Sequence, residues 1–77
     1  MRILLVEDDP MNQDIACELL KETGLHVDIA ENGRQAVTKA ASTNYAVILM
    51  DMQMPEMGGL EATAIIRTIP DRRWTPI

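Results

Sequence analysis

Two short runs of consecutive hydrophobic residues stand out along the chain, and both end at acidic residues. The first covers residues 3–6 and stops at Glu7, and the second covers residues 46–50 and stops at Asp51. Such uninterrupted runs are typical of parallel strands that helices cover on both faces. Residues 25–29 alternate instead between apolar and polar, which predicts a less enclosed strand at the edge of a sheet.

Segments with helical spacing separate these strands. Asp9 and Asn32 are suited to cap the first two helices, Gly24 to stop the first, and a third is expected after Gly58-Gly59. The predicted apolar faces are Met11, Ile15, Ala16, Leu19 and Leu20 in the first helix, Ala36, Val37, Ala40 and Ala41 in the second, and Leu60, Thr63 and Ile66 in the third. The order β-α-β-α-β-α predicts right-handed crossovers and a parallel α/β sheet.

Composition narrows the class of protein. The chain has 77 residues, of which 47% are hydrophobic and 25% charged, as expected for one small globular domain. A formal charge of −5 argues against binding to nucleic acid, which needs a basic surface. No apolar run is long enough to span a membrane, and the lone Cys17 is expected to be a buried thiol. We therefore expect a cytoplasmic protein, or part of one.

Acidic residues follow two of the predicted strands, at the end where parallel sheets bind ligands. If the strands ending at Glu7-Asp8 and Asp51 are neighbours, three carboxylates meet, and their repulsion favours a bound cation. Their hard oxygens suit Mg²⁺ or Mn²⁺, and a carboxylate beside such an ion can attack phosphorus. The plainer alternative is that these acids are solvated or cap a helix, and for Asp9 the cap is preferred.

Two motifs resemble one protein family. Residues 6–10 (VEDDP) with Asn12-Gln13, and residues 51–59 (DMQMPEMGG), resemble the response-regulator receiver domain, in particular the type attached to hybrid sensor kinases. The resemblance covers the whole chain, from the first strand to the start of a fourth. It implies a flavodoxin-like parallel sheet, partial here, with strand order 2-1-3.

The resemblance also implies a role for individual residues. Asp51 matches the aspartate that accepts a phosphoryl group from a histidine kinase or phosphotransfer protein. Asp8 matches a direct ligand of Mg²⁺ or Mn²⁺, Glu7 a ligand that acts through water, and Gln53 a ligand through its backbone carbonyl. The implied function is that of a two-component signalling domain rather than an enzyme, with at most weak catalysis of its own phosphorylation and dephosphorylation.

The chain departs from the family pattern at its carboxyl end. Family members continue to a Ser or Thr after the fourth strand and a Lys after the fifth, both of which contact the phosphoryl group, and residues 1–77 contain neither element. We therefore expect a truncated receiver domain with impaired switching. The outer edge of residues 46–50 lacks an evident neighbour, which predicts a homo-oligomer through this edge or through residues 75–77. Trp74 is expected to pack back on the domain.

Two other functions disagree with the residues, and a third remains open. A phosphoaspartate hydrolase of the haloacid dehalogenase type would need a second aspartate two residues after Asp51, where Gln53 stands. A dinucleotide-binding fold would need a glycine-rich turn after the first strand, where this chain has acids. A self-associating fragment without phosphotransfer activity remains open as the alternative.

Overall fold

The chain folds into a parallel sheet with helices on both faces, in a computed structural model that describes residues 1–52, 54 and 57–77. The strands lie in the order β2-β1-β3, and β1 pairs in parallel with both neighbours. In chain order the elements are β1 (Arg2–Val6), α1 (Pro10–Lys21), β2 (His26–Ala30), α2 (Gly33–Ser42), β3 (Val47–Met50), α3 (Gly59–Arg67) and the 3₁₀ helix η1 (Pro70–Arg72). The predicted element order, partial flavodoxin-like sheet and strand order 2-1-3 are confirmed.

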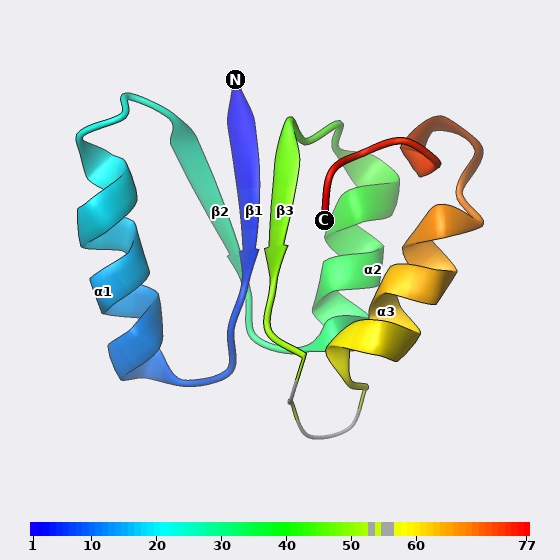
Figure 1. Cartoon of the computed structure of the whole chain (residues 1–77), viewed down its shortest axis with the longest axis horizontal. Coiled ribbons are helices and arrows are strands. Elements are labelled where there is room, and N and C mark those ends of the chain that lie inside the picture. Colours follow the sequence, from blue (N-terminus) through cyan, green and yellow to red (C-terminus); the bar gives the residue numbers. More distant parts are fainter. Residues whose placement is uncertain (53, 55–56) are drawn as a thin grey trace.

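The helices cover the two faces of the sheet unequally. Helix α1 lies on one face, while α2 and α3 lie together on the other (Figure 1). Cα partners in the sheet point to the same face, so Leu4 and Ile48 share the α2–α3 face. The main core lies there, and its buried members are Leu4, Val6, Ala30, Ala36, Ala40, Tyr45, Ile48 and Ile66.

Local signals in the sequence account for the ends of the helices. The Asp9 carboxylate accepts a hydrogen bond from the Met11 amide at 2.9 Å, and the Asn32 side chain accepts one from Gln35 at 2.8 Å. Gly24 has φ 74°, a left-handed conformation that favours glycine, shortly after the end of α1. The two predicted caps and the predicted stop are therefore confirmed.

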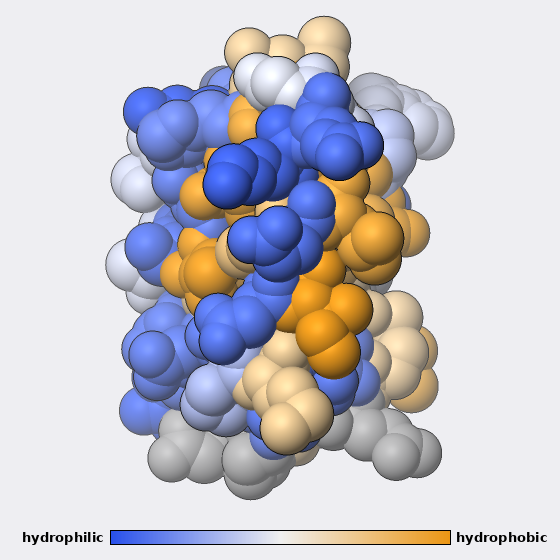
Figure 2. Space-filling model, turned by 90° about the vertical axis from the view of Figure 1, so that its left-hand side faces the viewer, coloured by the Kyte–Doolittle hydropathy of each residue, from blue (hydrophilic) through white to orange (hydrophobic). Residues whose placement is uncertain are grey.

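Helix α1 leaves much of its apolar surface exposed. None of its residues, all of which the structure describes, is buried, and Met11, Ile15 and Leu19 are 69%, 53% and 74% exposed. Figure 2 views this side of the molecule and shows hydrophobic surface on both sides of a polar ridge. In the described part of the chain no helix has the length needed to cross a bilayer, and α1 has 12 residues.

Cys17, which was expected to be buried, is half-buried, and two further predicted packing positions are wrong. Leu60 was expected on the buried face of α3, yet it is 77% exposed, while Ala62 and Ile66 are buried. The cause is that Gly59 already faces the core, and one residue further the helix has turned by about 100°. Trp74 was expected to pack back on the domain but is 86% exposed. Arg72, two residues earlier, is buried.

Two arginines hold the segment after α3. Arg72 Nε donates to the carbonyl oxygen of Ala40 at 2.7 Å, which ties η1 to α2. Arg67 Nη1 reaches three carbonyl oxygens, those of Arg72 at 3.3 Å, Arg73 at 3.0 Å and Thr75 at 2.5 Å.

The end of the chain then runs beside β3 (Figure 1), where the Ile48 amide donates to the Pro76 carbonyl at 2.8 Å. Part of the outer edge of β3, for which the sequence predicted no neighbouring strand, is therefore paired within the chain.

Candidate functional site

The acidic residues lie where β1 and β3 end side by side. Val6 and Met50 are Cα partners, so the residues that follow them, Glu7 and Asp51, leave the sheet next to each other. The Asp51 amide donates to the Val6 carbonyl at 3.0 Å, and the Glu7 amide donates to the Ala30 carbonyl at 3.0 Å. Sheet hydrogen bonding thus extends one residue past each strand and fixes the backbone of both acids.

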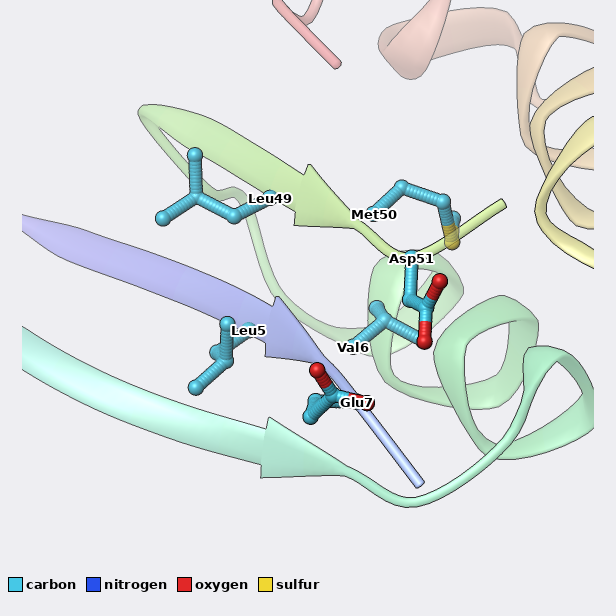
Figure 3. Close-up of a pocket in the computed structure, with 6 residues that line it drawn as sticks. All are labelled: Leu5, Val6, Glu7, Leu49, Met50 and Asp51. Atoms are coloured by element: carbon cyan, nitrogen blue, oxygen red, sulfur yellow. The ribbon is translucent and has the colours of Figure 1, made fainter. Parts of the chain in front are cut away.

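Three carboxylates meet at this position, as the sequence predicted. Glu7, Asp8 and Asp51 each offer an oxygen, and these oxygens all lie within 4.8 Å of one another. Glu7 and Asp51 are half-buried and Asp8 is exposed. In Figure 3 the Glu7 and Asp51 side chains project into the same space at the ends of their strands. They line a shallow pocket of about 280 Å³, whose other walls are Leu5, Val6, Leu49 and Met50.

The electrostatics of the cluster favour a cation. Burial raises the pKa of the Glu7 carboxyl, and the nearby Asp51 and Asp8 side chains raise it further, against an opposing hydrogen bond from the Asp9 amide. A bound cation would relieve this crowding of negative charge. The donor set consists of hard carboxylate oxygens open to solvent on one side, which fits Mg²⁺ with several of its waters retained.

The remaining predicted residues are Asp9 and Gln53. Asp9 stays outside it and caps α1, as preferred from the sequence. Gln53, the predicted carbonyl ligand, lies outside the described residues.

Two further residues shape the site: Gln13, for which the sequence suggested no role, and Gly59, which was expected to shape the loop and start the third helix. Gln13 Nε2 donates to the Glu7 carbonyl oxygen at 2.8 Å. Gly59, at the start of α3, lies so close to the Asp51 loop that an added Cβ would overlap the Asp51 carbonyl oxygen and come within 2.8 Å of Met52 Cα. Both residues stand inside the two motifs, but the contacts themselves depend on the folded arrangement.

Comparison with known proteins identifies the family. The family model described as the response regulator receiver domain matches residues 3–77. The chain belongs to this receiver-domain family. Among curated proteins it is 36% identical to the signal transduction histidine-protein kinase BarA of Escherichia coli over 77 residues, which are 100% of this chain and 8% of that kinase. The receiver domain described here therefore spans a small part of the length of the relatives it matches.

Solved structures agree with this assignment. The receiver domain of a sensor histidine kinase from Pseudomonas aeruginosa, crystallised with a magnesium ion in its active-site cleft, has a TM-score of 0.96 and 41% identity, covering 99% of this chain and 62% of that one. The response regulator TrrA of Thermotoga maritima, solved in complex with the histidine kinase ThkA, has a TM-score of 0.80 and 42% identity, covering 87% of this chain and 58% of that one. The fold and the class of signalling domain predicted from the sequence are confirmed.

Proposed function

We propose that Asp51 accepts a phosphoryl group from a histidine kinase or phosphotransfer protein, with Mg²⁺ held by Glu7, Asp8, Asp51 and the backbone carbonyl of Gln53. The observation that carries this proposal is the meeting of three carboxylates at the ends of β1 and β3. Gln53 enters through the motif resemblance alone. The magnesium ion in the Pseudomonas aeruginosa receiver domain and the kinase bound to TrrA support the choice of ion and partner.

The chemistry assigns separate tasks to the acids. One Asp51 carboxylate oxygen attacks the phosphorus of a phosphohistidine, the new O–P bond forms as the P–N bond breaks, and the electron pair of that bond remains on the imidazole nitrogen, which takes a proton from solvent. The hydrogen bond from the Asp51 amide to Val6 holds the attacking residue at the strand end. Bound Mg²⁺ supplies positive charge that offsets the carboxylates and the phosphoryl oxygens. Glu7 and Asp8 supply oxygens for the ion.

Phosphorylation by a small donor tests the assignment without a kinase. We expect incubation with acetyl phosphate and Mg²⁺ to add the mass of one phosphoryl group to the wild-type chain, and to add none to Asp51→Asn. Asp71→Asn, an exposed acid in η1, is the matched control and should react like wild type. A mass gain that persists in Asp51→Asn would refute Asp51 as acceptor. No gain in the wild type would favour the alternative of a self-associating fragment without phosphotransfer.

Metal binding is tested separately by following backbone amide NMR signals during titration with Mg²⁺ and, in parallel, Mn²⁺. We expect saturable shifts in the residues around Glu7 and Asp51, with a dissociation constant in the millimolar range. Equal responses in wild type and Asp51→Asn would count against the proposed ligand set.

A further inference from the structure

Gln13 closes the loop that carries two of the three acids. It is the fourth residue of α1, and its half-buried side chain turns back toward the end of β1. Its Nε2 donates to the Glu7 carbonyl oxygen at 2.8 Å, while its own amide donates to the Asp9 carbonyl at 2.9 Å. The side chain and the backbone of one residue therefore hold both ends of the segment 7–9.

The bond to the Glu7 carbonyl matters because of where that carbonyl lies. It belongs to the peptide that joins Glu7 to Asp8, so rotation of this peptide would swing the Asp8 carboxylate relative to the other two. The Glu7 amide is already fixed by its bond to Ala30 at 3.0 Å. Gln13 fixes the carbonyl group of the same residue.

Repulsion among the three carboxylates would separate them, and the hydrogen bond from Gln13 opposes that separation. Three carboxylate oxygens lie within 4.8 Å of one another, and Asp8 is exposed, so it is free to move into solvent if its backbone allows. Hydrogen bonds to the segment 7–9 oppose this movement, and among those printed for the described residues the bond from Gln13 acts on the linking peptide itself.

We propose that Gln13 is a positioning residue for the metal site, which holds the Glu7–Asp8 peptide so that the carboxylates stay gathered before the cation binds. This inference rests on the proposed metal site. Outer-shell hydrogen bonds of this kind orient ligands and raise metal affinity in proteins generally.

Gln35 provides a matched control. It also stands in the first turn of a helix and also bonds the preceding loop, because its Oε1 accepts a hydrogen bond from the Glu31 amide at 2.9 Å. That loop carries none of the three clustered acids. Gln13→Met and Gln35→Met each keep the length of the side chain and remove one such bond, so both should lose comparable stability.

The decisive measurement is the Mg²⁺ dissociation constant, obtained by amide NMR titration of wild type and both variants. We expect it to rise roughly tenfold in Gln13→Met, the lower end of the range for loss of an outer-shell partner, and to stay unchanged in Gln35→Met. Unchanged affinity in Gln13→Met, or an equal loss in Gln35→Met, would overturn the proposal while leaving Asp51 as acceptor.

A second readout separates this inference from the proposed function. If wild type bound no Mg²⁺, the proposed metal site would fail, and amide hydrogen exchange in metal-free protein would then decide the role of Gln13. Faster exchange at Asp8 and Asp9 in Gln13→Met than in wild type and Gln35→Met would support a loop held by Gln13. Equal exchange in all three proteins would overturn it.

Discussion

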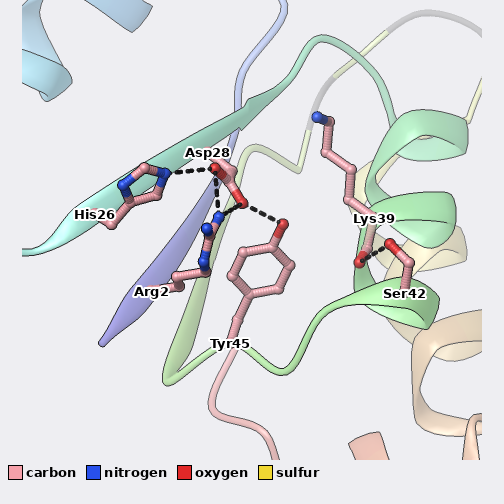
Figure 4. A network of polar contacts seen from close by, with 6 residues as sticks. All are labelled: Arg2, His26, Asp28, Lys39, Ser42 and Tyr45. Carbon is pink, nitrogen blue, oxygen red and sulfur yellow. Dashed lines mark hydrogen bonds and ion pairs between the residues drawn. The ribbon is translucent and has the colours of Figure 1, made fainter.

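Asp28, the middle residue of β2, contacts three side chains that come from or just before the starts of the three strands. Its carboxylate accepts from the Tyr45 hydroxyl at 2.7 Å and from Arg2 Nη1 at 3.1 Å, and His26 Nε2 lies 3.2 Å away (Figure 4). The Tyr45 hydrogen bond, followed by Arg2, holds the pKa of Asp28 below its usual range, although partial burial opposes this. Burial and the bond to Asp28 raise the pKa of Tyr45.

This lowered pKa has a defined effect on stability. An acid whose pKa is depressed in the folded state stabilises the fold above its unfolded pKa, and that contribution disappears as the pH falls through the folded value. We expect Asp28→Asn to lower the free energy of unfolding at neutral pH by about 1–2 kcal/mol, because it removes the charged acceptor of the hydrogen bonds from Tyr45 and Arg2. Below the folded pKa of Asp28 the difference from wild type should vanish.

Urea unfolding from neutral pH down to about pH 2 measures this difference. Asp14→Asn, on the exposed surface of α1, serves as the control and should follow the wild-type curve. A constant gap between Asp28→Asn and wild type over the whole pH range would contradict the assigned ionic role.

Among individual residues, the sequence predicts the clustered acids but not the hydrogen-bond partners that hold side chains and loops in place. Glu7, Asp8 and Asp51 are found because each follows a hydrophobic strand, which places them at one edge of the sheet. The partnership of Asp28 with Tyr45 joins residues 17 positions apart, and no local pattern encodes it. The same holds for Gln13, whose bond depends on how the loop turns.

Gly59 couples helix α3 to the loop of Asp51. A methyl group at residue 59 would overlap the Asp51 carbonyl, so Gly59→Ala must push the helix and the loop apart. We expect a loss of about 1–3 kcal/mol in the free energy of unfolding, typical of overpacking, together with slower phosphorylation by acetyl phosphate.

Gly58→Ala is the matched control, because among the described residues a Cβ at residue 58 would meet only the Met52 carbonyl oxygen, at 3.5 Å, and φ there is −72°. Urea unfolding and the initial rate of phosphorylation should both separate the two variants. Equal behaviour of Gly58→Ala and Gly59→Ala would show that the close approach is relieved without moving the Asp51 loop.

The hydrophobic pattern of the sequence predicts the helices and strands, but it predicts less securely which face of a helix is buried. The Asp9 and Asn32 caps mark the helix starts because each side chain satisfies an otherwise free amide. In α3 the chemical character of Leu60 favours burial, but the close contact of Gly59 sets the rotation of the helix and turns Leu60 outward. A contact with the loop therefore outweighs the burial of one leucine.

For the molecule as a whole, self-association remains a prediction. The Ile48–Pro76 bond pairs part of the β3 edge, while Leu49 stays 39% exposed and Ile15 on α1 53% exposed. We expect association at high micromolar concentration through the β3 edge, where Leu49→Lys should weaken it because charges block edge pairing. Ile15→Lys tests instead whether the exposed apolar surface of α1 takes part in the association. Light scattering that finds a folded monomer at every concentration would contradict the prediction.

The hydrogen bonds of Arg67 bear on how the exposed end of the chain meets proteases. A protease binds its substrate as an extended strand, but the carbonyl oxygens of Arg72, Arg73 and Thr75 are already engaged by Arg67. Trp74 is therefore exposed to solvent but not bound easily by a protease. Chymotrypsin can cleave after it only when this segment unfolds locally. Replacing Arg67 with methionine should accelerate cleavage after Trp74, whereas the same change at the exposed Arg34 should not. The arginine in α3 thus protects the chain at a site that exposure alone would leave vulnerable.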